Sequence, residues 1–180
     1  MKFYIADTHF GHENCIRFDE RPFETIDDMD RMLIINWNAR VQPEDEVYIL
    51  GDFIFRNKNH DFEWYLRHLN GRKYLVIGNH DAKLLKDEKA MEYFESVDRM
   101  MYVNDESNAI FLCHFPIVSW HKKYHGSYHI YGHIHANIDE DYYYMKTQER
   151  ALNAGCMING YMPVTFRELI VNNERFRKEH

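Results

Sequence analysis

Hydrophobic residues follow two kinds of pattern along the chain. Five short apolar runs, rich in β-branched and aromatic residues, have the length of buried strands. Between them, apolar residues recur at steps of three and four, which is the spacing of one helix face. Strands that alternate with helices predict an α/β layered fold. The predicted strands span residues 2–6, 47–50, 74–77, 109–113 and 128–131.

Helix-start signals support this order of elements. Thr25, with Asp28 three residues later, is typical of a helix start, and apolar residues then follow along one face. A second helix is predicted over residues 62–69. A third is predicted to begin after Thr165, with Glu168 as its capping partner.

Composition limits the class of protein. The 180 residues are 45% hydrophobic and 28% charged, so the chain can bury a core, and its length fits one domain over residues 1–180. The apolar runs are far shorter than the roughly 20 residues of a membrane helix, and no secretory signal pattern is visible. We therefore predict a cytoplasmic protein without a membrane partner. The net charge of −7 argues against bulk electrostatic binding of nucleic acid.

Histidine, and not cysteine, carries the candidate chemistry. The three cysteines show no CxxC spacing, which indicates neither a disulfide framework nor a cysteine-type zinc site. The chain has 12 histidines, several of them beside acids and glycines. A lone histidine at a strand end is more often a hydrogen-bonded structural residue. Here, however, potential metal ligands follow all five predicted strands: Asp7 and His9, Asp52, Asn79, His114, and His133 with His135.

The carboxyl ends of strands in open α/β sheets gather ligand sites, so these segments can converge on one spot although they lie far apart in the sequence. The glycines just before several of them allow a sharp turn and a close backbone approach. The pattern therefore predicts one metal centre at the sheet edge. The motifs that carry it are Asp7-x-His9, Gly51-Asp52, Gly78-Asn79-His80-Asp81, His114 and Gly132-His133-x-His135.

In this order the motifs resemble the five signature motifs of the calcineurin-like metallophosphoesterases, over residues 7–135. The resemblance implies a four-layer αββα sandwich, with two mixed β-sheets flanked by helices and a two-metal site at one edge. It also implies the ligands. Asp7, His9, Asp52 and His135 would bind the first metal, and Asp52, Asn79, His114 and His133 the second, so that Asp52 bridges them.

The ligand types fit this chemistry. Carboxylate, imidazole and amide donors without thiolate suit two divalent ions of the borderline class, with Mn favoured and Fe, Ni or Zn as alternatives. Two such ions can clamp the attacking and leaving oxygens of a displacement at phosphorus. The resemblance implies that a hydroxide bridging the metals is the nucleophile. It also implies that His80 protonates the leaving oxygen, against the alternative of a purely structural histidine.

The chain departs from one branch of the family. Protein phosphatases carry Gly-Asp-x-x-Asp-Arg, whereas Phe55 stands here where the second Asp would orient the catalytic histidine. The orienting partner of His80 is therefore open, with Asp81 as a guess. Arg56 falls at the family's phosphate-contacting position, and His12, beside the first metal loop, is a second candidate for substrate binding.

These features favour a phosphodiesterase acting on a phosphate ester, possibly a nucleotide. Only 18 residues separate His114 from His133, which leaves no room for a capping domain. The loop over residues 115–125 mixes cations with aromatic rings, a composition that can grip phosphate and stack on a base or form an ordinary exposed loop. The alternatives are a nuclease acting on DNA or short RNA, a phosphomonoesterase, or an inert interaction scaffold that has kept the fold.

Overall fold

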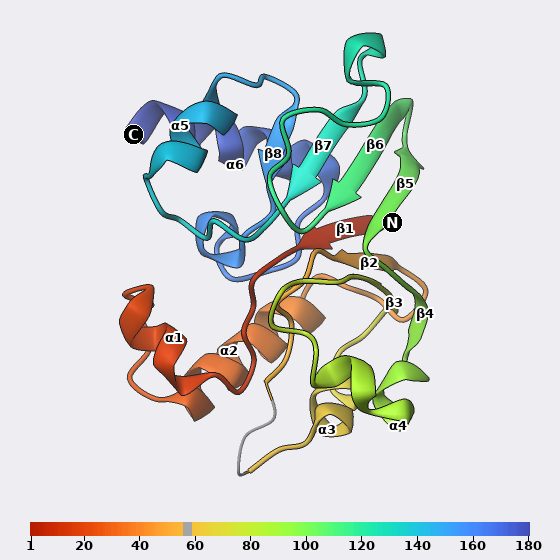
Figure 1. Ribbon diagram of the computed structural model, residues 1–180. Helices are drawn as coiled ribbons and strands as arrows, with labels where there is room; N and C mark the ends of the chain where they lie inside the picture. Colours follow the sequence, from red (N-terminus) through yellow and green to blue (C-terminus); the bar gives the residue numbers. More distant parts are fainter. Residues whose placement is uncertain (56–58) are drawn as a thin grey trace.

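The computed structural model describes residues 1–55 and 59–180. Within these residues, two four-stranded sheets lie at the centre, with helices on both outer sides (Figure 1). The first sheet contains β1 (Lys2–Ile5), β2 (Glu46–Ile49), β3 (Arg72–Val76) and β4 (Phe94–Asp98) in that order. The second contains β5 (Met100–Asp105), β6 (Asn108–Cys113), β7 (Tyr128–Tyr131) and β8 (Ala151–Asn153).

The strand directions follow from the connections. In the first sheet the named strands are all parallel, because each pair is joined through intervening helices. The second sheet is mixed. β5 runs antiparallel to β6 across a two-residue turn, whereas β6, β7 and β8 are parallel. The ends of β1, β2 and β3 therefore share one edge, as do those of β6 and β7.

Helices begin at the capping residues that the sequence indicates. Thr25 accepts the Asp28 backbone N–H, and Thr165 forms a complete capping box with Glu168. The helices are α1 (Glu13–Phe18), α2 (Ile26–Asn38), α3 (Phe62–Arg67), α4 (Glu88–Met91), α5 (Glu140–Lys146) and α6 (Phe166–Glu179). Three short 3₁₀ turns are η1 (Leu84–Lys86), η2 (Lys123–His125) and η3 (Cys156–Asn159).

Side chains of β1 show how the layers are built. Phe3 and Ile5 belong to a buried cluster with residues of α2 and α3, while Tyr4 and Ala6 face a second cluster shared with the other sheet. This division follows from the two-residue period of a strand, which sends neighbouring side chains to opposite faces. The same alternation holds in β2. The first sheet is therefore covered by helices on one face and by the second sheet on the other.

The outer face of the second sheet is covered as well. Tyr131 of β7 packs in a third cluster with Tyr142 and Met145 of α5, whereas its neighbour Ile130 faces the first sheet. The arrangement is helices, sheet, sheet, helices, which confirms the predicted αββα sandwich. The five predicted strands are present, and β4, β5 and β8 are additional. Among the described residues, no helix is long and apolar enough to cross a membrane.

Candidate metal centre

The predicted ligands lie directly after strand ends that share one edge of the sandwich. Asp7 and His9 follow β1, Asp52 follows β2, and Asn79 follows β3. His114 follows β6, while His133 and His135 follow β7. Backbone hydrogen bonds join the two sheets here: Ala6 N–H donates to Ala154, just beyond β8, at 2.8 Å. Strand topology therefore brings together segments that are more than 100 residues apart.

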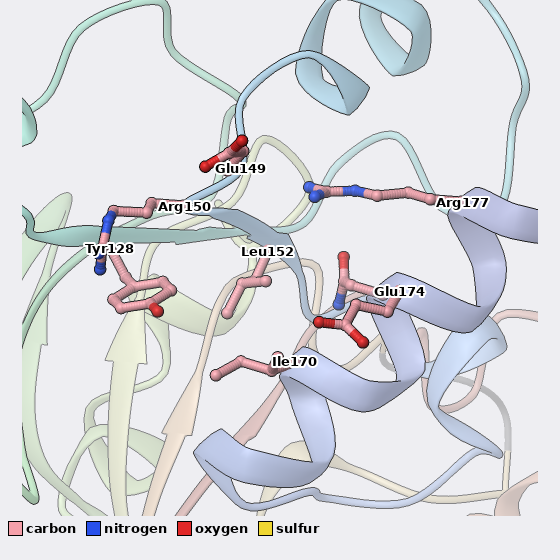
Figure 2. Close-up of a pocket in the computed structure, with 8 residues that line it drawn as sticks. Tyr128, Glu149, Arg150, Leu152, Ile170, Glu174 and Arg177 are labelled. Atoms are coloured by element: carbon pink, nitrogen blue, oxygen red, sulfur yellow. The ribbon is translucent and has the colours of Figure 1, made fainter.

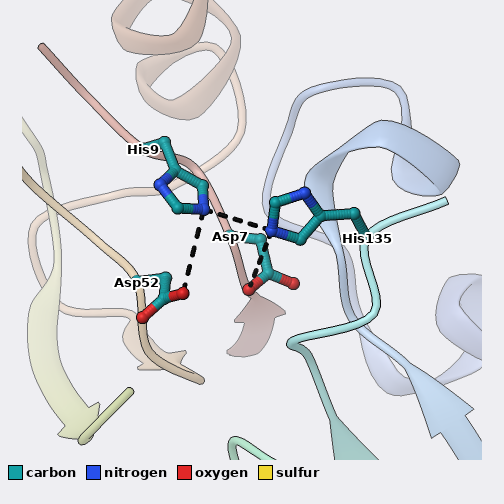
Figure 3. A group of neighbouring side chains, drawn as sticks. All are labelled: Asp7, His9, Asp52 and His135. Carbon is teal, nitrogen blue, oxygen red and sulfur yellow. Dashed lines mark hydrogen bonds and ion pairs between the residues drawn. The ribbon is translucent and has the colours of Figure 1, made fainter. Parts of the chain in front are cut away.

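Four of these side chains form a compact group (Figure 3). Asp7, His9 and Asp52 are buried and His135 is half-buried, and one potential ligand atom from each lies within 4.8 Å of the others. The Nε2 atoms of His9 and His135 are 3.2 Å apart. His135 Nε2 lies 4.0 Å from Asp7 Oδ1. The structure thus brings together the whole ligand set expected for the first metal.

The expected ligands of the second metal also meet. His114 Nε2 lies 2.9 Å from Asn79 Oδ1, and His133 Nδ1 lies 3.0 Å from that same oxygen. Asp52 connects this group to the first, because its Oδ2 is 3.6 Å from His114 Nε2 and 3.9 Å from His9 Nε2. One carboxylate oxygen is therefore near ligand atoms of both groups.

The hydrogen bonds of His114 test whether a cation fits. Its Nδ1 lies 2.7 Å from the carbonyl oxygen of Leu50, which can only accept, so Nδ1 carries the proton. In the neutral ring, Nε2 then directs a lone pair at two oxygens, those of Asn79 and Asp52. Lone pairs that converge in this way repel one another unless a cation lies between them. The donor set therefore fits a divalent metal ion.

The backbone at the ligands is in an uncommon conformation. Among the described residues, nine non-glycine residues have positive φ. Five of these nine are predicted ligands: Asp7, His9, Asp52, His133 and His135, with φ between 51° and 73°. Left-handed backbone costs energy for such residues and clusters at functional sites. The strained loops therefore support a site whose ligand directions matter more than local stability.

Asp81 ties two of these loops together. Its carboxylate accepts the backbone N–H groups of Asp52 at 3.0 Å, Phe53 at 2.9 Å and Gly78 at 2.8 Å. These bonds join the loop that carries Asp52 to the loop that carries Asn79. The guess that Asp81 orients the His80 ring is therefore wrong: both Asp81 oxygens are engaged by the backbone. Burial raises the pKa of Asp81, against the lowering effect of these bonds.

A second supporting pair, Asp19 and Arg21, was missed in the sequence. Asp19 Oδ1 accepts a hydrogen bond from His135 Nδ1 at 2.8 Å, and buried Arg21 donates to Asp19 Oδ2 from two nitrogens at 3.0 and 2.9 Å. Arg21 also donates to the carbonyls of Thr8 at 2.8 Å and Asp7 at 2.9 Å. A carboxylate behind a ligand imidazole fixes its tautomer and direction. An Asp-x-Arg sequence in a loop is too common to reveal this.

Burial dominates the electrostatics of the ion-free site. It lowers the pKa of His9 to about 2 and raises that of Asp7 to about 6. Burial also lowers the pKa of His135, but the hydrogen bond to Asp19 and the charge of Asp7 outweigh it, so the net shift is upward. His9 is thus held neutral, which is the form that binds metal.

The other predicted residues differ in position. The His80 side chain is exposed, and its backbone N–H donates to Asp52 Oδ1 at 2.8 Å. His12 is half-buried and stacks on Phe55, with ring centroids 4.2 Å apart. Phe55 also lies 5.6 Å from the His80 ring. Arg56 lies outside the described residues.

A separate cavity of about 400 Å³ lies between β7, β8 and α6 (Figure 2). None of the seven predicted ligands lines it. Arg150 covers the Tyr128 ring at 4.8 Å, and Arg177 donates to the Ala151 carbonyl oxygen. The cationic side chains in this cavity therefore already have partners within the fold.

Comparisons with known proteins agree with this geometry. A family model for calcineurin-like phosphoesterases matches residues 3–115. An uncharacterized protein of Methanocaldococcus jannaschii is 34% identical over 170 residues, covering 94% of this chain and 88% of that protein. The gene 66 protein of Mycobacterium phage L5 is 26% identical over 160 residues, covering 74% and 76%.

A solved structure extends the match. A protein of unknown function from Aquifex aeolicus is 28% identical, covers 93% of this chain and 96% of its own, and superposes with a TM-score of 0.74. The family model ends before His133 and His135, whereas this fold match spans nearly the whole chain. The last two ligands therefore rest on geometry.

Proposed function

Because the chain belongs to the calcineurin-like phosphoesterase family, we propose that it is a phosphodiesterase that holds two divalent metal ions around Asp52. Family membership and the Asp/His cluster support metal-dependent phosphoester hydrolysis. One observation carries the two-metal part of the proposal: Asp52 Oδ2 lies between His9 Nε2, at 3.9 Å, and His114 Nε2, at 3.6 Å. A bridging ligand needs this position.

The assignment of ligands follows the two groups. Asp7, His9, Asp52 and His135 would hold one ion, and Asp52, Asn79, His114 and His133 the other. When bound, the ions supply an activated water and the positive charge that offsets the phosphoryl oxygens. Mixed oxygen and imidazole donors suit Mn, with Fe, Ni and Zn as the competing ions.

His80 is assigned to the leaving group. Its ring is exposed beside the ligands, with centroids 5.8 Å from His9, and its backbone is held by Asp52 Oδ1. A histidine in this place can give a proton from its imidazole to the leaving oxygen, which is a role suited to a group that titrates near neutral pH. Asp52 therefore contributes twice, through its carboxylate and by fixing the His80 backbone.

Two features favour diesters over monoesters. Phe55 replaces the carboxylate of the phosphatase pattern, and its phenyl ring cannot accept a hydrogen bond from His80. The connection between His114 and His133 contains only 18 residues, too few for a capping domain. An open site of this kind can admit a substituent on each side of the phosphate.

The test is hydrolysis by metal-stripped protein titrated with Mn²⁺, using an aryl phosphodiester and the matching monoester. We expect Mn²⁺-dependent cleavage of the diester, lost in Asp52→Asn and retained in Asp141→Asn, which removes an exposed carboxylate elsewhere. Faster monoester cleavage would contradict the diester assignment. Metal-loaded protein that cleaves neither ester would contradict the aryl-diester prediction, while steeply salt-dependent cleavage of oligonucleotides would favour the nuclease alternative.

A further inference from the structure

Phe115 places an apolar ring at the rim of the metal centre. It follows His114 directly, and its side chain is 42% exposed. Its ring centroid lies 5.0 Å from that of His114 and 4.6 Å from that of His133, both edge to face, at 78° and 62°. These contacts fix the orientation of the ring from one side. Much of the phenyl group remains open to solvent beside two predicted ligands.

The rest of the aromatic and basic loop does not stay at this rim. Ile110 pairs with Tyr128 in parallel register, so the residues just before Tyr128 lie at the start of β6, whereas His114 follows its end. The η2 turn, with Lys123 and Tyr124, accordingly projects beyond the opposite end of β7 (Figure 1). The structure thus separates Phe115 from the remainder of the loop.

A second aromatic pair contacts the other group of ligands. Phe55 lies 5.4 Å from the His9 ring and stacks on His12 at 4.2 Å, with an interplanar angle of 12°. His9 belongs to the first ligand group and His133 to the second. The ligand set is therefore contacted by a phenyl ring from each group, with the exposed Asn79 and His80 among the residues nearby.

We propose that Phe115 stacks on a planar ring of the substrate, and that the site takes phosphodiesters bearing a nucleobase or aryl group. This inference rests on the proposed function, because it needs the phosphate to lie at the ligands. A substituent on that phosphate leaves the site past its rim, where the open phenyl surface lies next to His133. Stacking on an aromatic side chain tolerates any base, so it selects a ring and not a sequence.

The test measures binding of a dinucleotide with 2-aminopurine at one position and a phosphorothioate linkage, by fluorescence, to Mn²⁺-loaded protein. Stacking quenches 2-aminopurine. We expect quenching with wild type and Phe115→Tyr, and about 5- to 100-fold weaker binding with little quenching for Phe115→Leu. Tyr124→Leu, which removes an 87% exposed ring at the other end of β7, should bind as wild type does.

Other outcomes separate the two proposals. Equal binding and quenching by wild type and Phe115→Leu would overturn the stacking role, even if aryl diesters are cleaved. Equal loss in Phe115→Leu and Phe115→Tyr, with unchanged bound Mn²⁺, would also overturn it, since a ring alone would not suffice. The proposed function fails on different grounds, namely wild-type protein that binds no Mn²⁺ or Asp52→Asn that still cleaves the diester.

Discussion

Asp19 Oδ1 accepts the Nδ1–H of His135 at 2.8 Å, so the opposite nitrogen of that imidazole is left with its lone pair directed at the ligand group. Arg21 holds Asp19 in place from behind. The direction of one metal ligand is thus set by two residues that carry none of the expected motifs.

We predict that Asp19→Ala weakens Mn²⁺ binding by about 10- to 100-fold, because His135 loses the partner that fixes its tautomer. Asp19→Asn keeps an acceptor oxygen and should lose less. Glu149→Ala, which removes an exposed carboxylate at the distant cavity, is the matched control for charge. Calorimetric titration gives the affinities. An unchanged affinity in Asp19→Ala would show that the hydrogen bond has no role in metal binding.

His80→Ala should lower turnover by about 10²- to 10⁴-fold while the amount of bound metal stays near that of wild type. The reason is that the ring is assigned to the leaving group, whereas its backbone contact with Asp52 survives the substitution. His125→Ala, at the exposed η2 turn, serves as control. Metal analysis beside steady-state kinetics checks this. Loss of metal in parallel with turnover would make His80 a structural residue.

Gly78→Ala should destabilise the protein by about 1–3 kcal/mol and reduce metal binding. An added Cβ would meet Oδ1 of Asp52 and lie 2.5 Å from its backbone nitrogen. Gly126→Ala separates this collision from backbone strain, because Gly126 has φ +86° with no atom near the added Cβ. We expect Gly126→Ala to lose about 1–2 kcal/mol and to bind metal normally. Urea unfolding and metal analysis distinguish the two.

Asp30 predicts a pH effect on stability. It is buried, accepts the Gly11 N–H at 2.9 Å and the Tyr65 hydroxyl at 2.6 Å, and burial raises its pKa from 3.8 to about 6. The folded state therefore holds the proton more tightly than the unfolded state. Its contribution to stability is greatest below pH 4 and falls as the pH rises to about 6, by about 3 kcal/mol.

The comparison that isolates Asp30 uses Asp30→Asn, which cannot titrate. Between pH 4 and 6.5, metal-free wild type should lose free energy of unfolding relative to this variant, because the contribution of Asp7 is common to both. Denaturant titrations at several pH values measure the difference. Parallel curves for the two proteins would contradict the raised pKa of Asp30.

The sequence was sufficient for features that depend on local pattern and strand order. Five buried strands have unbroken apolar runs, and residues such as Asp52 and His114 follow them directly, so topology alone brings these ligands to one edge. β4 and β5 were missed because their side chains are half-exposed and mixed in polarity, and β8 has only three residues. Such strands are formed by pairing with neighbours, which a local pattern does not encode.

The supporting residues depend on three-dimensional contacts. Asp81 stands beside His80 in sequence, which suggested a side-chain partner, yet its oxygens accept backbone groups from two loops. Arg21 crosses to the Asp7 and Thr8 carbonyls from a segment without apolar periodicity. Nothing in residue type or spacing distinguishes these roles from those of ordinary surface charges.

The most direct test of the account is the number of Mn²⁺ ions bound per chain, measured in wild type and in Asp52→Asn after removal and return of metal. We predict two ions for wild type and fewer than one for Asp52→Asn, because one carboxylate serves both groups. A single ion in wild type, or two ions retained without the Asp52 carboxylate, would contradict the shared two-metal centre.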